Sequence, residues 1–381
     1  MSLLITFSPD AFWITSSILV FLLCILFAGV LIPQILLISF RRNLLDEPDE
    51  RKIHKAEVPR LGGIAFKPVV FTSIVLLLGI SQLLGYSGML DGLSMEGRTL
   101  SFGFCSIMVL YLVGMADDLI GIRYRAKFVV QLACGLMMVA GGLYINDLHG
   151  LFFIHALPEW IAYPVTMVAV VFIINAINLI DGIDGLASGL CGVAMLFYGV
   201  IFLSSHKYIY AMLAFGTLGV LVPFFYYNVF GDAERKRKIF MGDTGSLTIG
   251  MMLCILSLKI LQCFPEEGLL GRSNMFVLAY APLIIPCFDV VRVYLHRVRN
   301  GKNPFLPDKN HIHHKLLAIG MKQRVAMITI VSVSILFTLC NILLSLYVSV
   351  TLLLIADIIV WTLANMWLSR KIKEKAGNIK S

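Results

Sequence analysis

Residues 159–203 read EWIAYPVTMVAVVFIINAINLIDGIDGLASGLCGVAMLFYGVIFL. Two apolar runs, 159–177 and 185–203, flank a short polar segment that carries acids and amides. An apolar run of about 20 residues is long enough to cross a bilayer as a helix. Ionisable groups at membrane depth are costly and usually line a site. The stretch therefore predicts two membrane helices joined by a functional turn.

The rest of the chain has the same character. Of its 381 residues, 59% are hydrophobic and 14% are charged, whereas a soluble domain is typically about half apolar and about a quarter charged. This composition excludes an ordinary soluble enzyme and an intrinsically disordered protein. About eleven apolar runs are long enough to span a membrane. They cover approximately 12–40, 64–85, 99–116, 128–145, 159–177, 185–203, 208–228, 246–264, 275–295, 325–347 and 349–368.

The fold class predicted from these runs is all-α, a polytopic integral membrane bundle of about eleven transmembrane helices that forms one domain over residues 1–381. The polar motifs fall between about 50 and 320, the last two helices at about 325–368, and a basic tail at 369–381. The last two runs nearly touch, so a tight helical hairpin is expected there.

The distribution of Lys and Arg predicts the orientation. Of these 31 residues, 27 fall on the side that holds the C-terminal tail. Since cytoplasmic loops carry an excess of Lys and Arg, the N-terminus is expected outside and the C-terminus in the cytoplasm. The same bias accounts for the formal net charge of +8, so no nucleic-acid partner is expected.

Four polar clusters and one basic loop occur at the predicted cytoplasmic ends of the spans. In the first cluster, Asp117 and Asp118 end the third span. Adjacent helical residues point about 100° apart, so the two acids cannot share one role. Neighbouring carboxylates repel each other unless a cation or a proton neutralises one of them. The pair alone fits a cation site or a catalytic base, and equally a solvated helix end.

The second cluster lies in the turn quoted above. Asn178 and Asp181 are three residues apart and share a helix face, and Asp184 follows. Gly182 and Gly185 allow the backbone to approach a ligand closely. Such amides and acids suit a metal ion or a ribose and uracil, and the alternative is a plain polar turn.

The third cluster is the string FMGDTGS at 240–246. Asp243 at a glycine-flanked helix start fits a simple N-cap. It also fits a carboxylate ligand for a hard cation, with Gly242 and Gly245 admitting a phosphate to the backbone N–H groups. Phe240 is placed either to stack on a base or to face the membrane.

The fourth cluster holds three histidines, His311, His313 and His314, and follows the span that ends with Asp289 and Arg292. Zinc is not favoured, because the cysteines offer no matching ligands and the nearby acids favour a hard cation. Phosphate binding or proton transfer is expected instead, with a plain basic loop as the alternative. The basic loop at 51–63 ends in PRLGG and leads into the second span.

These clusters fall on one side of the membrane and hold five acids, Asp117, Asp118, Asp181, Asp184 and Asp243. Five carboxylates at one level would repel one another unless a divalent ion lay among them. Oxygen ligands favour Mg²⁺, which often binds through one or two carboxylates plus substrate phosphates. The chemistry that fits is phosphoryl-type transfer at a membrane face, between a lipid phosphate and a soluble nucleotide.

Five strings, in this order, carry a resemblance to a known family: PRLGG at 59–63, the Asp117–Asp118 pair, NAINLIDGIDGLA at 175–187, FMGDTGS at 240–246 and HIHH at 311–314. They resemble those of the polyprenyl-phosphate N-acetylhexosamine-1-phosphate transferases, glycosyltransferase family 4. The separated form HIHH and the number of spans are similar to the undecaprenyl-phosphate GlcNAc-1-phosphate branch. One departure is the charged segment 231–238, which lengthens the usual link between Asn228 and the FMGDTGS string.

The resemblance implies a reaction and its partners. UDP-N-acetylhexosamine and undecaprenyl or another polyprenyl phosphate would react, with Mg²⁺ or Mn²⁺, to release UMP and start the synthesis of a cell-envelope glycan. The enzyme would lie in the bacterial inner membrane with its active site on the cytoplasmic face. A homodimer is one option for the oligomeric state, which the sequence leaves open, as it leaves open the hexosamine and the glycan.

The resemblance also implies roles for individual residues. Catalytic roles fall to Asp117, Asp118, Asp243, His311, His313 and His314. Nucleotide- or phosphate-binding roles fall to Lys55, Lys127, Asn178, Asp181, Asp184, Asn228 and Phe240. The metal ligands would be Asp243, Asn178, Asp117 and Asp118, and Gln131 also matches a family position.

Three alternatives stay open at this point. The first is the sister reaction with UDP-MurNAc-pentapeptide in peptidoglycan synthesis. The second is an ion-coupled transporter, although transporters usually place their coupling acids near the middle of the bilayer. The third concerns mechanism, since direct attack by the lipid phosphate competes with a two-step route through an aspartyl-phosphate.

Overall fold

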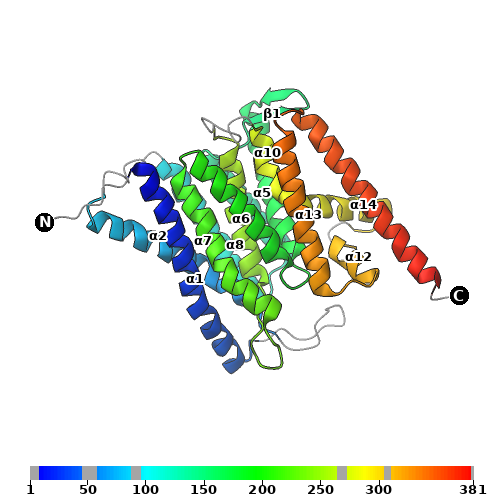
Figure 1. Ribbon diagram of the computed structural model, residues 1–381, viewed down its shortest axis with the longest axis horizontal. Coiled ribbons are helices and arrows are strands. Elements are labelled where there is room, and N and C mark those ends of the chain that lie inside the picture. Colours follow the sequence, from blue (N-terminus) through cyan, green and yellow to red (C-terminus); the bar gives the residue numbers. More distant parts are fainter. Residues whose placement is uncertain (1–7, 45–57, 87–95, 264–272, 304–309, 379–381) are drawn as a thin grey trace.

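The computed structural model describes residues 8–44, 58–86, 96–263, 273–303 and 310–378. These residues form a helical bundle with one two-stranded antiparallel sheet at one end (Figure 1). The elements before the sheet are α1 (Pro9–Arg41), η1 (Gly62–Ala65), α2 (Phe66–Leu83), α3 (Gly97–Ile120) and α4 (Tyr124–Ala140). The sheet, β1 (Asp147–Leu151) and β2 (Ile154–Ala156), is followed by α5 (Glu159–Ile180), α6 (Leu186–Ser204), α7 (Tyr208–Phe225), η3 (Tyr226–Phe230) and α8 (Gly242–Ile260). The last elements are α10 (Met275–Tyr280), η4 (Ala281–Leu283), α11 (Ile284–Arg299), α12 (Ile312–Ala318), α13 (Gln323–Leu344) and α14 (Val350–Asn378).

Ten helical segments in the described ranges are long and apolar enough to cross a membrane, which confirms the membrane bundle. The one predicted run without such a helix in the described ranges is the fourth, 128–145, which corresponds to α4, a helix of only 17 residues. It is short because Gly141 and Gly142 end it, Gly142 with a φ of +83° that glycine adopts readily. The start of α1 and the end of α14 lie at opposite ends of the bundle (Figure 1). Which end faces the cytoplasm stays a prediction.

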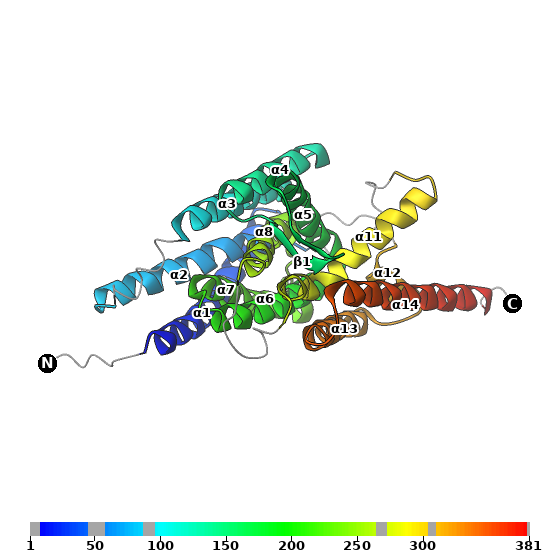
Figure 2. The same ribbon diagram turned by 90° about the horizontal axis from the view of Figure 1, so that it is seen from above.

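Helix α8 is the centre of the bundle, with α3, α5, α6 and α10 packed around it (Figure 2). In its membrane-spanning window, 94% of the residues are buried. The small residues of α8 let neighbouring backbones approach, as is usual in membranes. At Gly250, for example, a Cβ would lie 3.0 Å from the Cα of Ile174 on α5. This packing fixes the first turn of α8, which carries Asp243.

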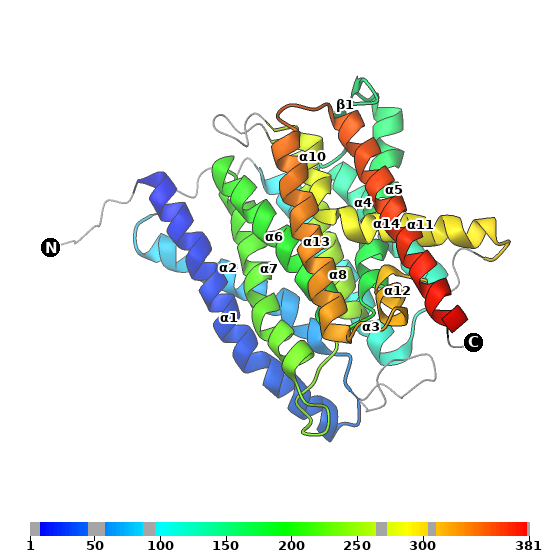
Figure 3. The ribbon, with the colours of Figure 1, turned by 45° about the vertical axis from the view of Figure 1, so that its right-hand side comes forward.

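Two membrane segments are irregular. Helix α7 contains Pro223 and continues into the π-helix η3, which carries the buried Asn228. Short π-helical turns within longer helices are frequent at functional sites. The span that begins with α10 is interrupted at η4, next to Pro282, because proline lacks the N–H that a continuous helix needs. Beyond this break, α11 runs across the direction of α13 and α14 (Figure 3).

The expectation of a tight hairpin for the last two helices is wrong. A short connection does join α13 to α14, but the two helices diverge and α12 lies between their far ends (Figure 1). Helix α12 contacts both of them, and Lys315 on α12 donates to Asn365 Oδ1 and Ser369 Oγ on α14 at 3.2 and 3.1 Å. The short helix that follows the histidine string therefore separates the two long helices.

Candidate active site

The basic loop and the FMGDTGS string are bound to each other through their backbones. Phe240 N donates to Pro59 O at 2.9 Å, Gly62 N to Phe240 O at 3.0 Å, and Gly63 N to Met241 O at 2.9 Å. A Cβ on Gly63 would lie 2.0 Å from the backbone N of Gly245, so no larger residue fits there. Two strings that are about 180 residues apart in the sequence thus form one wall of a site.

Asp118 holds the start of α8. Its carboxylate accepts hydrogen bonds from Asp243 N at 2.8 Å, from Thr244 N at 2.9 Å and from Thr244 Oγ1 at 2.6 Å. A carboxylate at the first N–H groups of a helix satisfies donors that have no partner within the helix and favours its dipole. Asp118 therefore positions Asp243. Its predicted role as a metal ligand stays a prediction.

Asp117 and Asp243 share one ammonium group. Lys127, in the first turn of α4, lies 2.9 Å from Asp117 Oδ2 and 2.7 Å from Asp243 Oδ2. The other oxygen of Asp243 accepts from Asn178 Nδ2 at 3.0 Å. All three charged side chains are partly exposed, between 13% and 26%. Helices α3, α4, α5 and α8 thus contribute one residue each to a single polar centre, which we call the acidic centre.

Asp181 belongs to the same end of the bundle. It follows α5 directly and its surface is exposed to solvent. Enough protein nevertheless surrounds the carboxyl group that burial, helped by repulsion from Asp243, raises its pKa to about 7, against the opposing effect of Arg60. We call the solvent-accessible surface around this carboxyl group, next to the acidic centre, the recess.

Asp184 and Asn228 form the other side of this recess. Lys238 Nζ lies 2.5 Å from Asp184 Oδ2, and both side chains are nearly buried. Asn228 accepts from Gly185 N at 2.6 Å and donates to Ile239 O at 2.9 Å. Despite the lengthened segment 231–238, Asn228 therefore still joins the turn after α5 to the FMGDTGS string. That segment contributes Lys238, a cation that the sequence did not single out.

The histidine string reaches the same turn through His313. Its ring is 1% exposed, and neither ring nitrogen has a hydrogen-bond partner within the described part of the chain. A Cβ on Gly182 would lie 2.2 Å from His313 Nε2, so only glycine permits this contact. Burial, with repulsion from His314, lowers the pKa of His313 to about 3. A buried imidazole without a partner, beside Asp181, is available to a bound ligand.

The other two histidines stack on His313. The ring centroids of His311 and His313 are 5.9 Å apart and their planes differ by 6°, and His314 lies 4.2 Å from His313. His311 is bound through Nδ1 to Asp289 Oδ2 at 2.9 Å. Asp289 and Arg292 mark the end of the ninth predicted span, but nothing in the sequence pairs either of them with a histidine.

The structure therefore brings most of the predicted residues together. Direct contacts join Lys127 to Asp117 and Asp243, and Asn178 to Asp243. Gln131 Oε1 accepts from Asn175 Nδ2 at 2.7 Å, and Asn175 lies on the same helix as Asn178. Lys55 lies outside the described residues. Burial of polar groups, which would have revealed Lys238 and Asp289, becomes visible only once the helices are packed.

The acidic centre bears on the predicted Mg²⁺. Among the residues that the structure describes, no group of three or more Asp, Glu, His or Cys side chains could hold a metal ion. The sequence predicted a divalent ion because five neighbouring carboxylates repel one another. Two lysines already reduce this repulsion, since Lys127 is bound to Asp117 and Lys238 to Asp184. The fit to Mg²⁺ is still good, because this ion needs only one or two carboxylates when substrate phosphates complete its shell. Asp117 and Asp243 already hold a cationic group between them.

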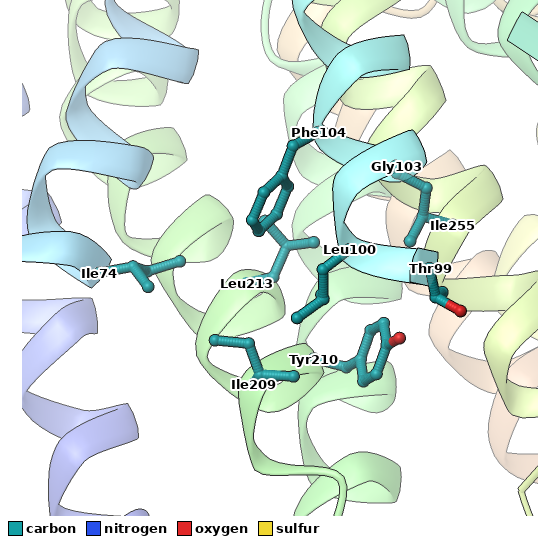
Figure 4. Close-up of a pocket in the computed structure, with 9 residues that line it drawn as sticks. All are labelled: Ile74, Thr99, Leu100, Gly103, Phe104, Ile209, Tyr210, Leu213 and Ile255. Carbon is teal, nitrogen blue, oxygen red and sulfur yellow. The ribbon is translucent and has the colours of Figure 1, made fainter. Parts of the chain in front are cut away.

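A small apolar cavity lies elsewhere, toward the other end of α8. It is lined by Ile74, Thr99, Leu100, Gly103, Phe104, Ile209, Tyr210, Leu213 and Ile255 (Figure 4). Its volume of about 10 Å³ has room for little more than one water molecule. Because it is apolar and remote from Asp243, it is not part of the candidate active site.

Known proteins resemble this chain in sequence. The sequence profile described as glycosyl transferase family 4 matches residues 100–261, which contain the acidic pair, the turn after α5 and the FMGDTGS string. A Bacillus subtilis (strain 168) protein named probable undecaprenyl-phosphate N-acetylglucosaminyl 1-phosphate transferase is 30% identical over 335 residues, 86% of this chain and 84% of that protein. The chain therefore belongs to glycosyl transferase family 4, which confirms the resemblance seen in its motifs.

Two further relatives are named undecaprenyl-phosphate alpha-N-acetylglucosaminyl 1-phosphate transferase. The Yersinia pestis protein is 29% identical over 303 residues, 77% of this chain and 74% of its own length. The Escherichia coli (strain K12) protein is 28% identical over 297 residues, with 76% and 73% covered. The chain is thus similar to transferases from both a Bacillus species and enteric bacteria over most of its length.

Proposed function

We propose that this protein transfers N-acetylhexosamine-1-phosphate, and specifically GlcNAc-1-phosphate, from a UDP-sugar to undecaprenyl phosphate with release of UMP. The names of its relatives support this acceptor and this sugar. The observation that carries the proposal is the acidic centre, in which Lys127 joins Asp117 to Asp243 at the membrane-spanning bundle's polar end. Two anionic phosphates need fixed cations around them, and the carboxylates of the acidic centre would hold such cations in place.

The reaction follows from the chemistry of the two phosphates. An oxygen of the lipid phosphate attacks the β-phosphorus of the UDP-sugar and forms a new P–O bond. The bond from the β-phosphorus to the oxygen that bridges the two phosphates breaks, and UMP leaves with that oxygen. Since most catalysis of phosphoryl transfer comes from positioning and charge neutralisation, the side chains need only orient the phosphates and compensate their charge.

The acidic centre would orient the phosphates, and compensation of their charge would also need a divalent cation, because its two carboxylates outnumber its single ammonium group. Asp117 would orient the lipid phosphate, or take a proton from it, while Lys127 holds both carboxylates at their present positions. Mg²⁺, if bound through Asp243 with Asn178 and Asp117 beside it, would neutralise oxygens of the diphosphate. Asp118 acts indirectly, because its hydrogen bonds hold the backbone of Asp243 and Thr244.

The recess beside the acidic centre fits the donor nucleotide. Asp181, Asp184 and Asn228 line or support it, and the backbone of Phe240 is held by Pro59 and Gly62 at its edge. Polar acceptors and an aromatic ring are what a uridine needs. The histidines would lie at the diphosphate and sugar, with the unpartnered His313 closest to the turn after α5.

The cellular setting belongs to the same proposal. An active site on the cytoplasmic face of a bacterial inner membrane would have access to soluble UDP-GlcNAc and to the headgroup of the lipid carrier. The product would start a cell-envelope glycan. The polar clusters gather at one end of the bundle, which argues against an ion-coupled transporter, since transporters usually place such groups at mid-membrane.

Exchange of labelled UMP into UDP-GlcNAc by purified protein, with undecaprenyl phosphate and Mg²⁺, tests the proposal. The wild type should catalyse exchange, and Asp243→Ala should lower the rate by about 10³-fold. Asp357→Asn is the matched control, because Asp357 is a buried acid on α14 that is bound to Asn341 and Tyr280 and lies outside the motif strings. It should keep the wild-type rate. Exchange that requires UDP-MurNAc-pentapeptide, or that survives in Asp243→Ala, would refute the proposal.

The same assay separates the two mechanisms. Rapid quenching with a donor labelled in its β-phosphate should show no label on the protein if the lipid phosphate attacks directly. A labelled protein adduct that forms and decays at the rate of turnover would instead establish the two-step route through an aspartyl-phosphate.

A further inference from the structure

Asp289 is a completely buried carboxylate on α11, outside the five motif strings. One of its oxygens accepts from His311 Nδ1 at 2.9 Å, and the other from Arg292 Nη2 at 2.8 Å. The backbone N of Ile312 lies 3.1 and 3.2 Å from the two oxygens. A histidine, an arginine and a backbone N–H group from two separate segments thus converge on one side chain.

Such an arrangement is costly unless it serves to hold something. Removing a carboxylate and a guanidinium from water costs several kcal/mol per ion, and the attraction between them seldom gives a net gain in stability. Replacement by apolar residues would often be at least as stable. Stability alone is thus a weak reason for the Asp289–Arg292 pair, and the residues that it contacts indicate what it does.

The group that Asp289 positions is the start of the histidine string. Arg292 also donates to Asn310 O, so the Asp289–Arg292 pair binds three consecutive residues, 310–312. His311 contacts Asp289 through Nδ1. In a neutral ring the proton therefore lies on Nδ1, and Nε2 is the nitrogen without a proton. The parallel stack on His313 fixes the plane of the ring.

The position of this ring links α11 to the candidate active site. His313, on which His311 stacks, contacts the turn after α5 at Gly182, directly beside Asp181. The contacts therefore run from Asp289 through His311 and His313 to the recess. A change at Asp289 would be transmitted to the site through the orientation of His311.

We propose that Asp289, supported by Arg292, is a positioning residue that fixes the ring orientation and the Nδ1–H tautomer of His311, so that Nε2 faces the substrate diphosphate. The proposal rests on the proposed function, since it assumes a bound UDP-sugar. Carboxylates that orient a histidine in this way hold the correct tautomer and stabilise the protonated ring when it forms.

A double-mutant cycle with Asp289→Asn and His311→Ala tests this role, with kcat and KM for UDP-GlcNAc measured in the UMP exchange assay. Asp289→Asn should lower kcat roughly 10- to 100-fold, with KM changed less than about threefold. In the His311→Ala background the same substitution should change kcat less than about twofold, because the group that it orients is gone. If Asp289 only stabilised the fold, Asp289→Asn would lower kcat by the same factor in both backgrounds.

Two controls keep the test decisive. Asp357→Asn removes a buried membrane carboxylate with other partners and should leave kcat unchanged. If Asp289→Asn does not yield folded protein, Arg292→Gln is the substitute variant. Arg292→Gln keeps the Asp289–His311 contact but removes the hydrogen bond from Arg292 to Asn310 O. Its smaller loss of kcat, about 3- to 10-fold, should likewise vanish in the His311→Ala background.

The outcomes separate this inference from the proposed function. Equal losses in both backgrounds, or a wild-type kcat in Asp289→Asn, would overturn the positioning role while exchange by the wild type still upholds the function. If the wild type shows no exchange at all, the proposed function fails, and with it the role assigned to His311.

Discussion

At each end of α8 a lysine is bound to a carboxylate, and the two ends differ in how completely their polar groups are satisfied. At one end, Lys259 contacts both oxygens of Glu96 at 2.9 and 2.7 Å, and Tyr210 donates to Glu96 at 2.9 Å. Lys207 adds a second cation at 3.5 Å. The carboxylate of Glu96 is thus bound on both oxygens by fixed groups of the protein, Lys259, Tyr210 and Lys207.

The acidic centre at the other end is different. One ammonium group, that of Lys127, is shared by two carboxylates, Asp181 lies open to solvent beside them, and His313 has no partner within the described residues. Polar groups left incomplete at a protein–membrane boundary await a ligand. In this fold a buried ion pair therefore does not by itself indicate a ligand site. A cluster in which one ammonium group serves two carboxylates beside an unpartnered histidine does indicate one.

The largest effect should separate the two lysines. Lys127→Met should lower the exchange rate by about 10²–10³-fold, because Asp117 and Asp243 would lose their shared cation and repel both each other and the substrates. Lys259→Met should keep kcat within about twofold and lower the free energy of unfolding by about 1–3 kcal/mol. Exchange kinetics and thermal unfolding in detergent measure both. If Lys127→Met and Lys259→Met lose equal activity, the two ends of α8 do not differ in function.

A smaller effect is expected at the contact of the histidine string with the turn after α5. Gly182→Ala should lower kcat by about 10²-fold, because the methyl group would overlap His313 Nε2 and displace the ring by about 1 Å. Gly192→Ala on α6 is the control, since its Cβ would meet Leu218 at an ordinary 3.6 Å. If both variants are equally active, His313 does not need its observed position.

The lengthened segment 231–238 should affect donor binding. Lys238→Met removes the cation from Asp184 at the wall of the recess and should raise KM for UDP-GlcNAc about 5- to 10-fold, with little change in kcat. Restoration by Lys238→Arg would show that the charge matters. A fall in kcat at constant KM would instead assign Lys238 to the chemical step.

The smallest effect is a pH dependence at Asp181. Because its pKa is raised to about 7 in the folded protein, ionisation of Asp181 destabilises the fold as the pH rises from about 4 to 7. This destabilisation is absent below about pH 3.9, the pKa of Asp in an unfolded chain. Asp181→Asn should therefore raise the unfolding temperature at pH 8 and leave it unchanged near pH 4. Thermal unfolding without divalent ions measures this, and a difference that is constant with pH would contradict it.

Hydropathy and motif order predict much of this molecule. The membrane runs correspond to helices, and the acidic pair, the turn after α5, the FMGDTGS string and the histidines do converge. Hydropathy fails where lateral packing decides. It cannot show that α12 separates α13 from α14, nor that Gly141 and Gly142 shorten α4.

Individual roles within the site were harder to predict than its location. Asp117 and Asp118 are adjacent in the sequence, yet one faces Lys127 and the other caps α8. Lys238 and Asp289 find their partners only in the folded bundle, 54 and 22 residues away along the chain. Spacing along one helix predicts a shared face, but the partner of a buried charge on another helix is set by tertiary packing.

The most direct test of the account is an experimental structure of the protein in lipid with UDP-GlcNAc and Mg²⁺ bound. Uridine density is expected in the recess beside Asp181 and Asp184, with the diphosphate between the acidic centre and His313. Nucleotide density at any other place, such as the Glu96 end of α8, would contradict it.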